Sequence, residues 1–116
     1  MKTGVCSLIA GVLMLSPAHA EPSAGEALKD MAKADRSAIP SVFLNGAVAG
    51  LTWANSWLDL DGKPRLFCPP DKLALTLEQD ISILRHYVEE HPLLKVRPLS
   101  AVMLFALQDA FPCKGR

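Results

Sequence analysis

Apolar side chains recur at three- and four-residue steps along most of the chain, and this spacing predicts helices. Four segments carry the pattern: residues 24–34, 41–60, 77–91 and 98–111. No segment shows the strict alternation of apolar and polar residues that is typical of a half-buried strand. The pattern therefore predicts an all-α fold, a small four-helix domain.

Residues with well-defined capping roles mark the ends of the first and third of these helices. Ser23 with Glu26, and Thr76 with Gln79, form the S/T-x-x-E/Q pattern of a capping box at a helix N-terminus. Pro92 ends the third helix, because proline has no N–H to donate and its ring clashes with the preceding turn. These signals predict where two helices begin and where one of them stops.

The last predicted helix is apolar nearly all round. Pro98 suits its first turn. The apolar residues that follow are Leu99, Val102, Met103, Leu104, Phe105, Ala106 and Leu107. A helix without a clear polar face is normally surrounded by protein. We therefore expect this helix to be the central and most buried one.

The second predicted helix contains two glycines and two tryptophans at four-residue spacing. Gly46 and Gly50 each cost about 1 kcal/mol in helix propensity relative to alanine. We interpret them as positions that let another helix pack closely. Trp53 and Trp57 share one face of the helix. We assign them to the core, with a binding interface as the alternative.

The N-terminus has the layout of a secretory signal peptide. Lys2 supplies the positive charge, residues 5–15 are almost wholly apolar, and residues 18–20 form an A-x-A cleavage signal. A membrane anchor is the alternative, but the apolar run is shorter than the roughly 20 residues that span a bilayer. We predict a signal peptide over residues 1–20 and one domain over residues 21–116, located in the periplasm. After cleavage no membrane span is expected.

Two cysteines, Cys68 and Cys113, remain after residue 20. An even number in an exported protein favours a disulfide between them. Two free thiols or a bridge between two molecules are the alternatives. The disulfide within one molecule would close a loop of about 45 residues, which is worth roughly 4 kcal/mol of stability in the chain-entropy model.

The charge balance argues against two classes of partner. The chain has 12 basic and 12 acidic residues, and removal of residues 1–20 takes away one lysine, which leaves 11 − 12 = −1 with neutral histidines. The charges are scattered, so there is no basic patch of the kind that binds nucleic acid and no polybasic segment for anionic lipid.

The heptapeptide HYVEEHP, residues 86–92, resembles the signature strings of zinc peptidases. Its histidines, His86 and His91, are five residues apart, which places them about 140° from each other around a helix. The H-E-x-x-H motif needs two histidines on one face. The chain also lacks a G-x-S-x-G nucleophile elbow and a phosphate-binding glycine loop. We therefore expect no metal, no cofactor and no enzymatic activity, and we interpret the string as a helix end.

Several motifs, taken in order, resemble the Rap/Tai family of immunity proteins. They are a glycine-containing helix (residues 46–50), Cys-Pro-Pro (residues 68–70), Thr-x-x-Gln (residues 76–79), Tyr-x-x-x-His-Pro (residues 87–92) and Ala-Leu…Phe-Pro-Cys (residues 106–113). The resemblance covers residues 41–113. Members of that family are small exported helical proteins associated with type VI secretion amidase effectors. Many carry a second cysteine pair; here Met31 and Leu44 stand near those places.

The resemblance implies a non-enzymatic periplasmic binding protein that blocks a peptidoglycan amidase. An envelope structural or accessory protein without a toxin partner is the alternative. For the contact surface we select the end of the second helix and the turn after it, where an aromatic anchor has a charged rim. The selected residues are Trp57, Asp59, Asp61, Lys63 and Arg65. The sequence leaves open whether the protein forms a homodimer through its tryptophan or glycine face.

Overall fold

The structure is a computed structural model that describes residues 21–33 and 39–115. It contains α1 (Ala24–Met31), α2 (Ile39–Leu60), α3 (Leu77–Glu90), the 3-10 helix η1 (Pro92–Val96) and α4 (Leu99–Ala110). The described residues form no strand, so the predicted all-α, four-helix fold is confirmed. The expected signal peptide, residues 1–20, lies outside the described residues.

Both predicted capping boxes are present. The Ser23 hydroxyl accepts from the Glu26 N–H at 3.3 Å, and the Glu26 carboxylate accepts in return from the Ser23 N–H at 3.3 Å. Thr76 and Gln79 make the same reciprocal pair, at 3.3 and 2.9 Å. Each pair satisfies N–H groups that a helix leaves without an internal partner at its start. The sequence pattern was therefore sufficient to place the beginnings of α1 and α3.

The remaining helix boundaries differ from the prediction by small amounts. α2 begins at Ile39, two residues earlier than expected, with Pro40 in its first turn. It ends at Leu60. In the turn that follows, Gly62 adopts a φ of 66°. α3 ends at Glu90, as the position of Pro92 indicates, but the short η1 that follows was not predicted. Pro98 stands at the N-cap of α4, just outside its first turn.

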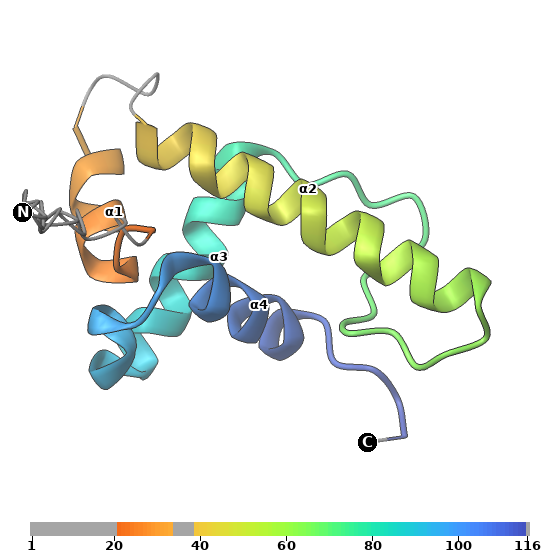
Figure 1. The fold of residues 1–116 in the computed structure, drawn as a ribbon. Coiled ribbons are helices and arrows are strands. Elements are labelled where there is room, and N and C mark those ends of the chain that lie inside the picture. The colour runs from red at the N-terminus through yellow and green to blue at the C-terminus, as the bar shows by residue number, and fades with distance from the viewer. Residues whose placement is uncertain (1–20, 34–38, 116) are drawn as a thin grey trace, which may run out of the picture.

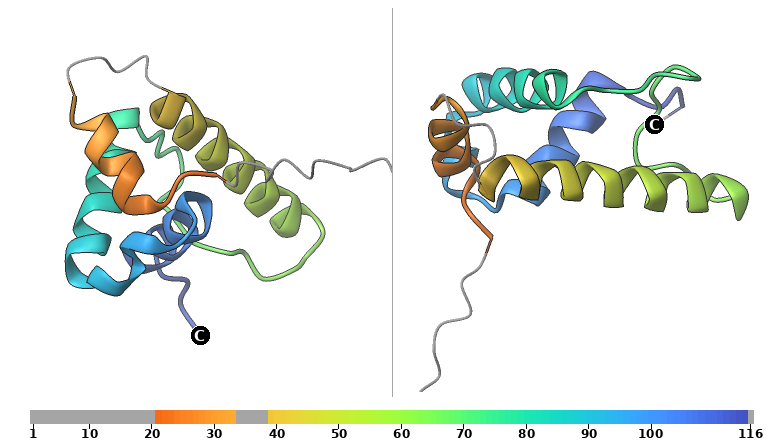
Figure 2. Two further views of the ribbon diagram at one scale, coloured as in Figure 1. Left: turned by 60° about the vertical axis from the view of Figure 1, so that its left-hand side comes forward. Right: turned by 90° about the horizontal axis from the view of Figure 1, so that it is seen from above.

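The helices enclose one core (Figure 1). α4 packs against both α3 and α2, and α1 lies across one end, in contact with α2, α3, α4 and η1. Seen from above, α2 and α3 form two sides of the molecule with α4 between them (Figure 2). The core residues are Ala24, Ala27, Met31, Leu44, Phe67, Ile81, Leu84, Val88, Leu99, Val102, Met103 and Leu107. α4 buries five residues, more than any other helix, which confirms that it is the central one.

The residues just before α1 lie against the start of α4. The N–H of Ala24 donates to the carbonyl of Arg97 at 2.9 Å, and the N–H of Leu99 donates to the carbonyl of Pro22 at 3.0 Å. The Ser100 hydroxyl donates to the Glu21 carboxylate at 2.7 Å. These bonds supply partners for backbone groups at two helix starts and hold α1 on the rest of the domain.

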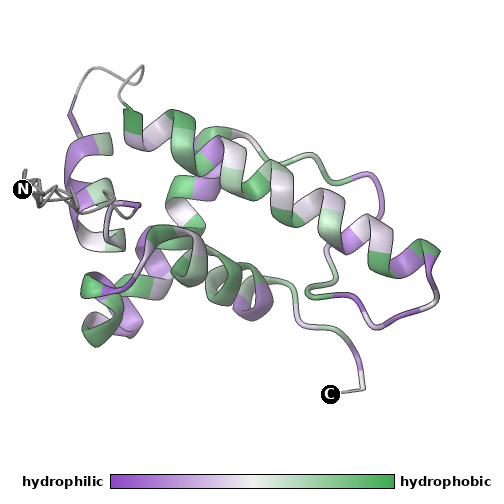
Figure 3. Cartoon of the chain, in the orientation of Figure 1, coloured by the Kyte–Doolittle hydropathy of each residue, from purple (hydrophilic) through white to green (hydrophobic). Residues whose placement is uncertain are grey.

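α2 is the longest helix and differs from the others in what surrounds it. Its second half extends past α3 and α4, and its neighbours there are loop segments (Figure 1). Coloured by hydropathy, it carries few hydrophilic positions before its last turn (Figure 3). In the part of the chain that is described, no helix is long and apolar enough to cross a membrane.

Candidate functional site

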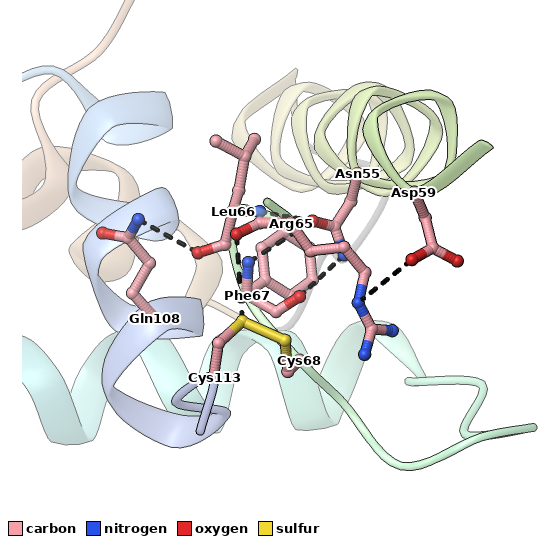
Figure 4. The surroundings of a disulfide bond; sticks show 8 residues. All are labelled: Asn55, Asp59, Arg65, Leu66, Phe67, Cys68, Gln108 and Cys113. Atoms are coloured by element: carbon pink, nitrogen blue, oxygen red, sulfur yellow. Dashed lines mark hydrogen bonds and ion pairs between the residues drawn. A yellow bond between two sulfur atoms is a disulfide. The ribbon is translucent and has the colours of Figure 1, made fainter. Parts of the chain in front are cut away.

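The loop between α2 and α3 is fixed to the domain by a disulfide and by the amide side chains of Asn55 and Gln108, of which Gln108 donates to the carbonyl of Leu66 at 3.1 Å (Figure 4). Cys68 is bonded to Cys113, which confirms the predicted pair and joins this loop to the end of α4. The Cys68 N–H also donates to the carbonyl of Phe111 at 2.8 Å. The two cysteines are 45 residues apart in the sequence. Because the bond between them restricts the unfolded chain, it stabilises the fold by roughly 4 kcal/mol.

Asn55 is the second anchor of this loop, and the sequence interpretation missed its role. Its side-chain NH₂ donates to the carbonyl of Phe67 at 2.8 Å, and its oxygen accepts from the N–H groups of Leu66 at 2.7 Å and Phe67 at 3.3 Å. Asn55 is 6% exposed. A buried loop backbone needs partners for its polar groups, and this one amide supplies three bonds.

The five residues selected as the contact surface fall on two different sides of the structure. Trp57 points outward from α2 with 69% of its surface exposed. Asp59 lies two residues further on, about 200° around the helix, and pairs with Arg65 at 3.7 Å. Asp61 and Lys63 form a second pair at 2.6 Å in the turn. Exposed pairs of this kind contribute little to stability, so all four charges are accessible to a partner at small cost.

The side of α2 that faces away from the core is almost wholly apolar. We call it the outer face of α2 and define it by Ile39, Val42, Gly46, Ala49, Gly50, Trp53, Trp57 and Leu60, all of which are exposed. Their spacing of three and four residues keeps them in one stripe along the helix. No residue from Ile39 to Leu58 is charged. Large exposed apolar patches on a small protein usually mark binding sites.

Two predictions about this face were wrong. Trp53 is 76% exposed and Trp57 is 69% exposed, so neither belongs to the core. Among the described residues nothing lies within 4 Å of a Cβ built on Gly46 or Gly50, so these glycines do not serve packing between helices of one molecule. The reason is geometric: the core-facing side of α2 is the opposite one, where Leu44 and Asn55 lie.

A groove of about 770 Å³ runs between α2 and the segment 69–75. Its walls include Asn45, Thr52 and Ser56 from the polar edge of α2. Asp80, in the first turn of α3, also lines the groove; it is 2% exposed, and no donor among the described residues reaches its Oδ1. Burial raises the pKa of Asp80 to about 6, because a charged carboxylate is poorly solvated there.

Both Asn55 and Asp80 are polar residues at core-facing positions of an apolar pattern. Asn55 falls between Leu51 and Leu58 in the periodic stripe of α2, and Asp80 lies four residues before Leu84 in α3. A polar side chain at such a position must find partners or cost stability. That is the sequence signal by which both residues could have been found.

The HYVEEHP string is a helix end, as expected. His86 and Glu90 are exposed and lie 3.6 Å apart, while the His91 ring stacks on Tyr87 with ring centres 4.2 Å apart. Nδ1 of His91 is 3.0 Å from the carbonyl oxygen of Tyr87, in the last turn of α3. Residues 21–33 and 39–115 contain no group of three or more histidine, cysteine or acidic side chains arranged to hold a metal ion.

No family model, curated protein or solved structure matches the chain.

Proposed function

We propose that the protein is a non-enzymatic periplasmic binding protein that inhibits a peptidoglycan amidase effector of type VI secretion. The observation that carries a binding role is the outer face of α2, where Trp53 and Trp57 stand exposed. Tryptophan is the residue type most enriched among the dominant contacts of protein interfaces. The identity of the partner rests on the motifs, from residues 46–50 to residues 106–113, that resemble the Rap/Tai family.

Within this proposal the effector contacts the end of α2 and the following turn. Trp57 supplies the aromatic anchor, and the Asp61–Lys63 pair supplies charges in the turn after α2. The Asp59–Arg65 pair lies on the other side of α2 and is not part of this contact. An apolar centre with a polar rim is the usual arrangement of a protein interface. Since Asn55 and the Cys68–Cys113 bond fix the loop behind this turn, little ordering is required on binding.

The test is co-purification with a secreted amidase encoded beside this gene, followed by an activity assay on peptidoglycan. Binding and inhibition are expected, and Trp57→Ala should weaken binding at least about tenfold, as for a central interface aromatic. Leu93→Ala is the matched control, because Leu93 is also a large exposed apolar side chain, at 87%, but lies on η1. If the amidase is neither bound nor inhibited, or if the gene has no such neighbour, an envelope accessory role takes the place of immunity.

We further propose that, when no effector is bound, two copies associate through the outer face of α2. When two α2 helices are placed antiparallel, the face is complementary to itself: Trp53 meets Gly46 of the second copy, and Trp57 meets Val42. In the same register Leu60 meets Ile39, and Ala49 meets Gly50. The tryptophans then lie opposite the smaller Gly46 and Val42, and the aliphatic Leu60 and Ile39 meet at the two ends of the interface. Two-fold pairing of one patch with itself is the usual geometry of homodimers.

The size of this face suits a stable dimer. α2 has 22 residues and is therefore about 33 Å long. Two copies bring together four exposed tryptophans, each able to bury about 150–250 Å², besides the flanking aliphatic residues. The interface is then roughly 1,000 Å² or more, which is the lower limit for specific association. An uncharged helix face adds no cost for the burial of charge.

Cysteine cross-linking distinguishes this pairing from its rivals. Ile39→Cys and Leu60→Cys variants, mixed and oxidised, should form a cross-linked heterodimer, whereas neither variant should cross-link with itself. Self-cross-linking of each variant would indicate parallel helices. Absence of any cross-link, together with a monomer mass in sedimentation at micromolar concentration, would refute the dimer. The dimer content of the Trp57→Ala protein is measured in parallel, so that loss of effector binding is not confused with loss of the dimer.

A further inference from the structure

The buried carboxylate of Asp80 lies in the groove between α2 and the segment 69–75 without a partner of its own. It is 2% exposed, and no donor in the described parts of the chain reaches its Oδ1. A carboxylate removed from water normally has hydrogen bonds or a cation to offset the loss of hydration. An acid kept at such a place without either indicates that its partner comes from another molecule.

The α2 side of the groove offers two hydroxyl oxygens as acceptors. The Thr52 hydroxyl donates its proton to the carbonyl of Val48 at 2.8 Å, and the Ser56 hydroxyl donates to the carbonyl of Thr52 at 3.0 Å. The lone pairs of both oxygens are left to accept. Asp80 and these two hydroxyls all line the groove, so a group that only donates would complement them.

Apolar surface adjoins this wall. Val48, Phe67, Pro69 and Leu75 also line the groove. A ligand that carries a donor-only head on an aliphatic stem matches both kinds of surface. Lysine has three donors and no acceptor, arginine has five, and both bury their methylene stems along apolar walls while the charged head meets polar groups. The volume of about 770 Å³ is ample for one such side chain.

We propose that this groove binds a lysine or arginine side chain presented by a protein partner, with the cationic head on Asp80. The inference rests on the proposed binding function and adds the chemistry of the partner: the bound protein places a basic residue, on an exposed segment, between α2 and residues 69–75. Complementary charge selects this occupant, since three carboxylates (Asp59, Asp71, Asp80) and two cations (Arg65, Lys72) line the groove.

The experiment uses blocked tripeptides as probes and follows the protein by amide NMR. A peptide with a central lysine should give saturable shifts in the groove side of α2 and the first turn of α3. A peptide with central norleucine keeps the stem and lacks the charge. Its affinity should be lower by about tenfold or more, because a charged hydrogen bond is lost. Asp80→Asn should reduce affinity for the lysine peptide by a similar factor.

Asp71→Asn is the matched control, since Asp71 lines the same groove but is exposed; affinity should change less than about threefold. Equal binding of the lysine and norleucine peptides, or full binding by Asp80→Asn, overturns the proposal. If n-butylamine binds as tightly as the lysine peptide, the site serves small amines and not a protein partner. Because no amidase is present, failure here leaves the proposed immunity function standing, and failure of the amidase assay leaves this site standing.

Discussion

α4 and α2 are comparably apolar helices, but the fold treats them differently. α4 lies between α2 and α3 and buries Leu99, Val102 and Met103 completely, while Phe105 is 42% exposed. α2 is covered on one side only, where Leu44 is buried, while Trp53 on the opposite side is 76% exposed. The difference shows that an apolar pattern locates a surface that must be covered but does not say which molecule covers it. On α4 the cover comes from the same chain; on α2 we propose that it comes from another.

Two side-chain truncations, one on α4 and one on α2, test this contrast with the largest expected effect. Met103→Ala on α4 should lower the free energy of unfolding by about 3 kcal/mol, because it leaves a cavity in a closely packed core. Trp53→Ala on α2 removes a larger side chain, but should change the stability of the monomer by only about 0.5 kcal/mol or less, since that side chain packs on little. Urea denaturation at low protein concentration measures both. Equal losses would mean that the outer face of α2 is covered within one molecule.

The next largest effect concerns the polar residue on the covered side of α2. Asn55→Ala should destabilise the protein by about 2 kcal/mol, because the Phe67 carbonyl and the Leu66 and Phe67 N–H groups lose their partner where water has little access. Ser56→Ala is the control: Ser56 is adjacent but exposed, and its hydroxyl bonds only within the helix. Thermal melting of both variants measures the difference. An Asn55→Ala protein as stable as the control would show that the disulfide and the bond from Gln108 to the Leu66 carbonyl are enough to hold the loop.

The sequence was sufficient for features that depend on local chemistry. Backbone geometry sets the capping pairs Ser23–Glu26 and Thr76–Gln79 and the helix end before Pro92. The Cys68–Cys113 bond followed from the even number of cysteines after residue 20. None of these depends on how far apart in the chain the packed elements are.

The sequence was insufficient where packing between distant segments decides the outcome. Trp53 and Gly50 were assigned to contacts inside the molecule, because periodicity gives the position of a face but not the direction of the core. α2 is apolar on two sides, and only its contacts with α1, α3 and α4 show which side is inner. The groove at Asp80 was missed for the same reason, since its two walls come from α2 and from a loop distant in sequence.

Asp80, in the first turn of α3, has an Oδ1 atom without a hydrogen-bond partner among the described residues, and its replacement should stabilise the protein. Its pKa in the folded state is raised to about 6 from the ordinary 3.8, so the native state binds more protons than the unfolded state between these values. Stability of the native protein therefore falls as pH rises through this window and stays low above it. Asp80→Asn lacks this loss and should be more stable by about 1–2 kcal/mol above pH 7.

Stability measured as a function of pH checks the sign of this effect. The advantage of Asp80→Asn should shrink as pH falls from 6 towards 4, because the carboxyl of the folded protein becomes neutral over this range, and it should be smallest below the ordinary pKa of 3.8, where the carboxyl is neutral in the folded and the unfolded states. An advantage that is constant with pH would show that the charge of Asp80 is not its cause. A residue that costs stability where it stands is typical of a binding site, so the result also bears on the proposed groove for a basic side chain.

The smallest expected effect comes from Gly50→Ala, which should change monomer stability and dimerisation in opposite directions. Gly50→Ala should raise the stability of the monomer by about 0.5–1 kcal/mol, because alanine has the better helix propensity and nothing lies within 4 Å of the added methyl group. The same methyl group would stand between two antiparallel helices near the two-fold axis, so dimerisation should weaken. Ala54→Gly is the reciprocal control, since Ala54 is exposed on α2 but outside the outer face; it should lower stability and leave the dimer unchanged. Denaturation at low concentration and sedimentation at high concentration measure the two quantities. If Gly50→Ala raises the stability of the monomer and weakens dimerisation, the glycines of α2 serve a partner helix at a cost to the stability of α2. If it raises both the stability and the dimerisation, the dimer contact lies elsewhere.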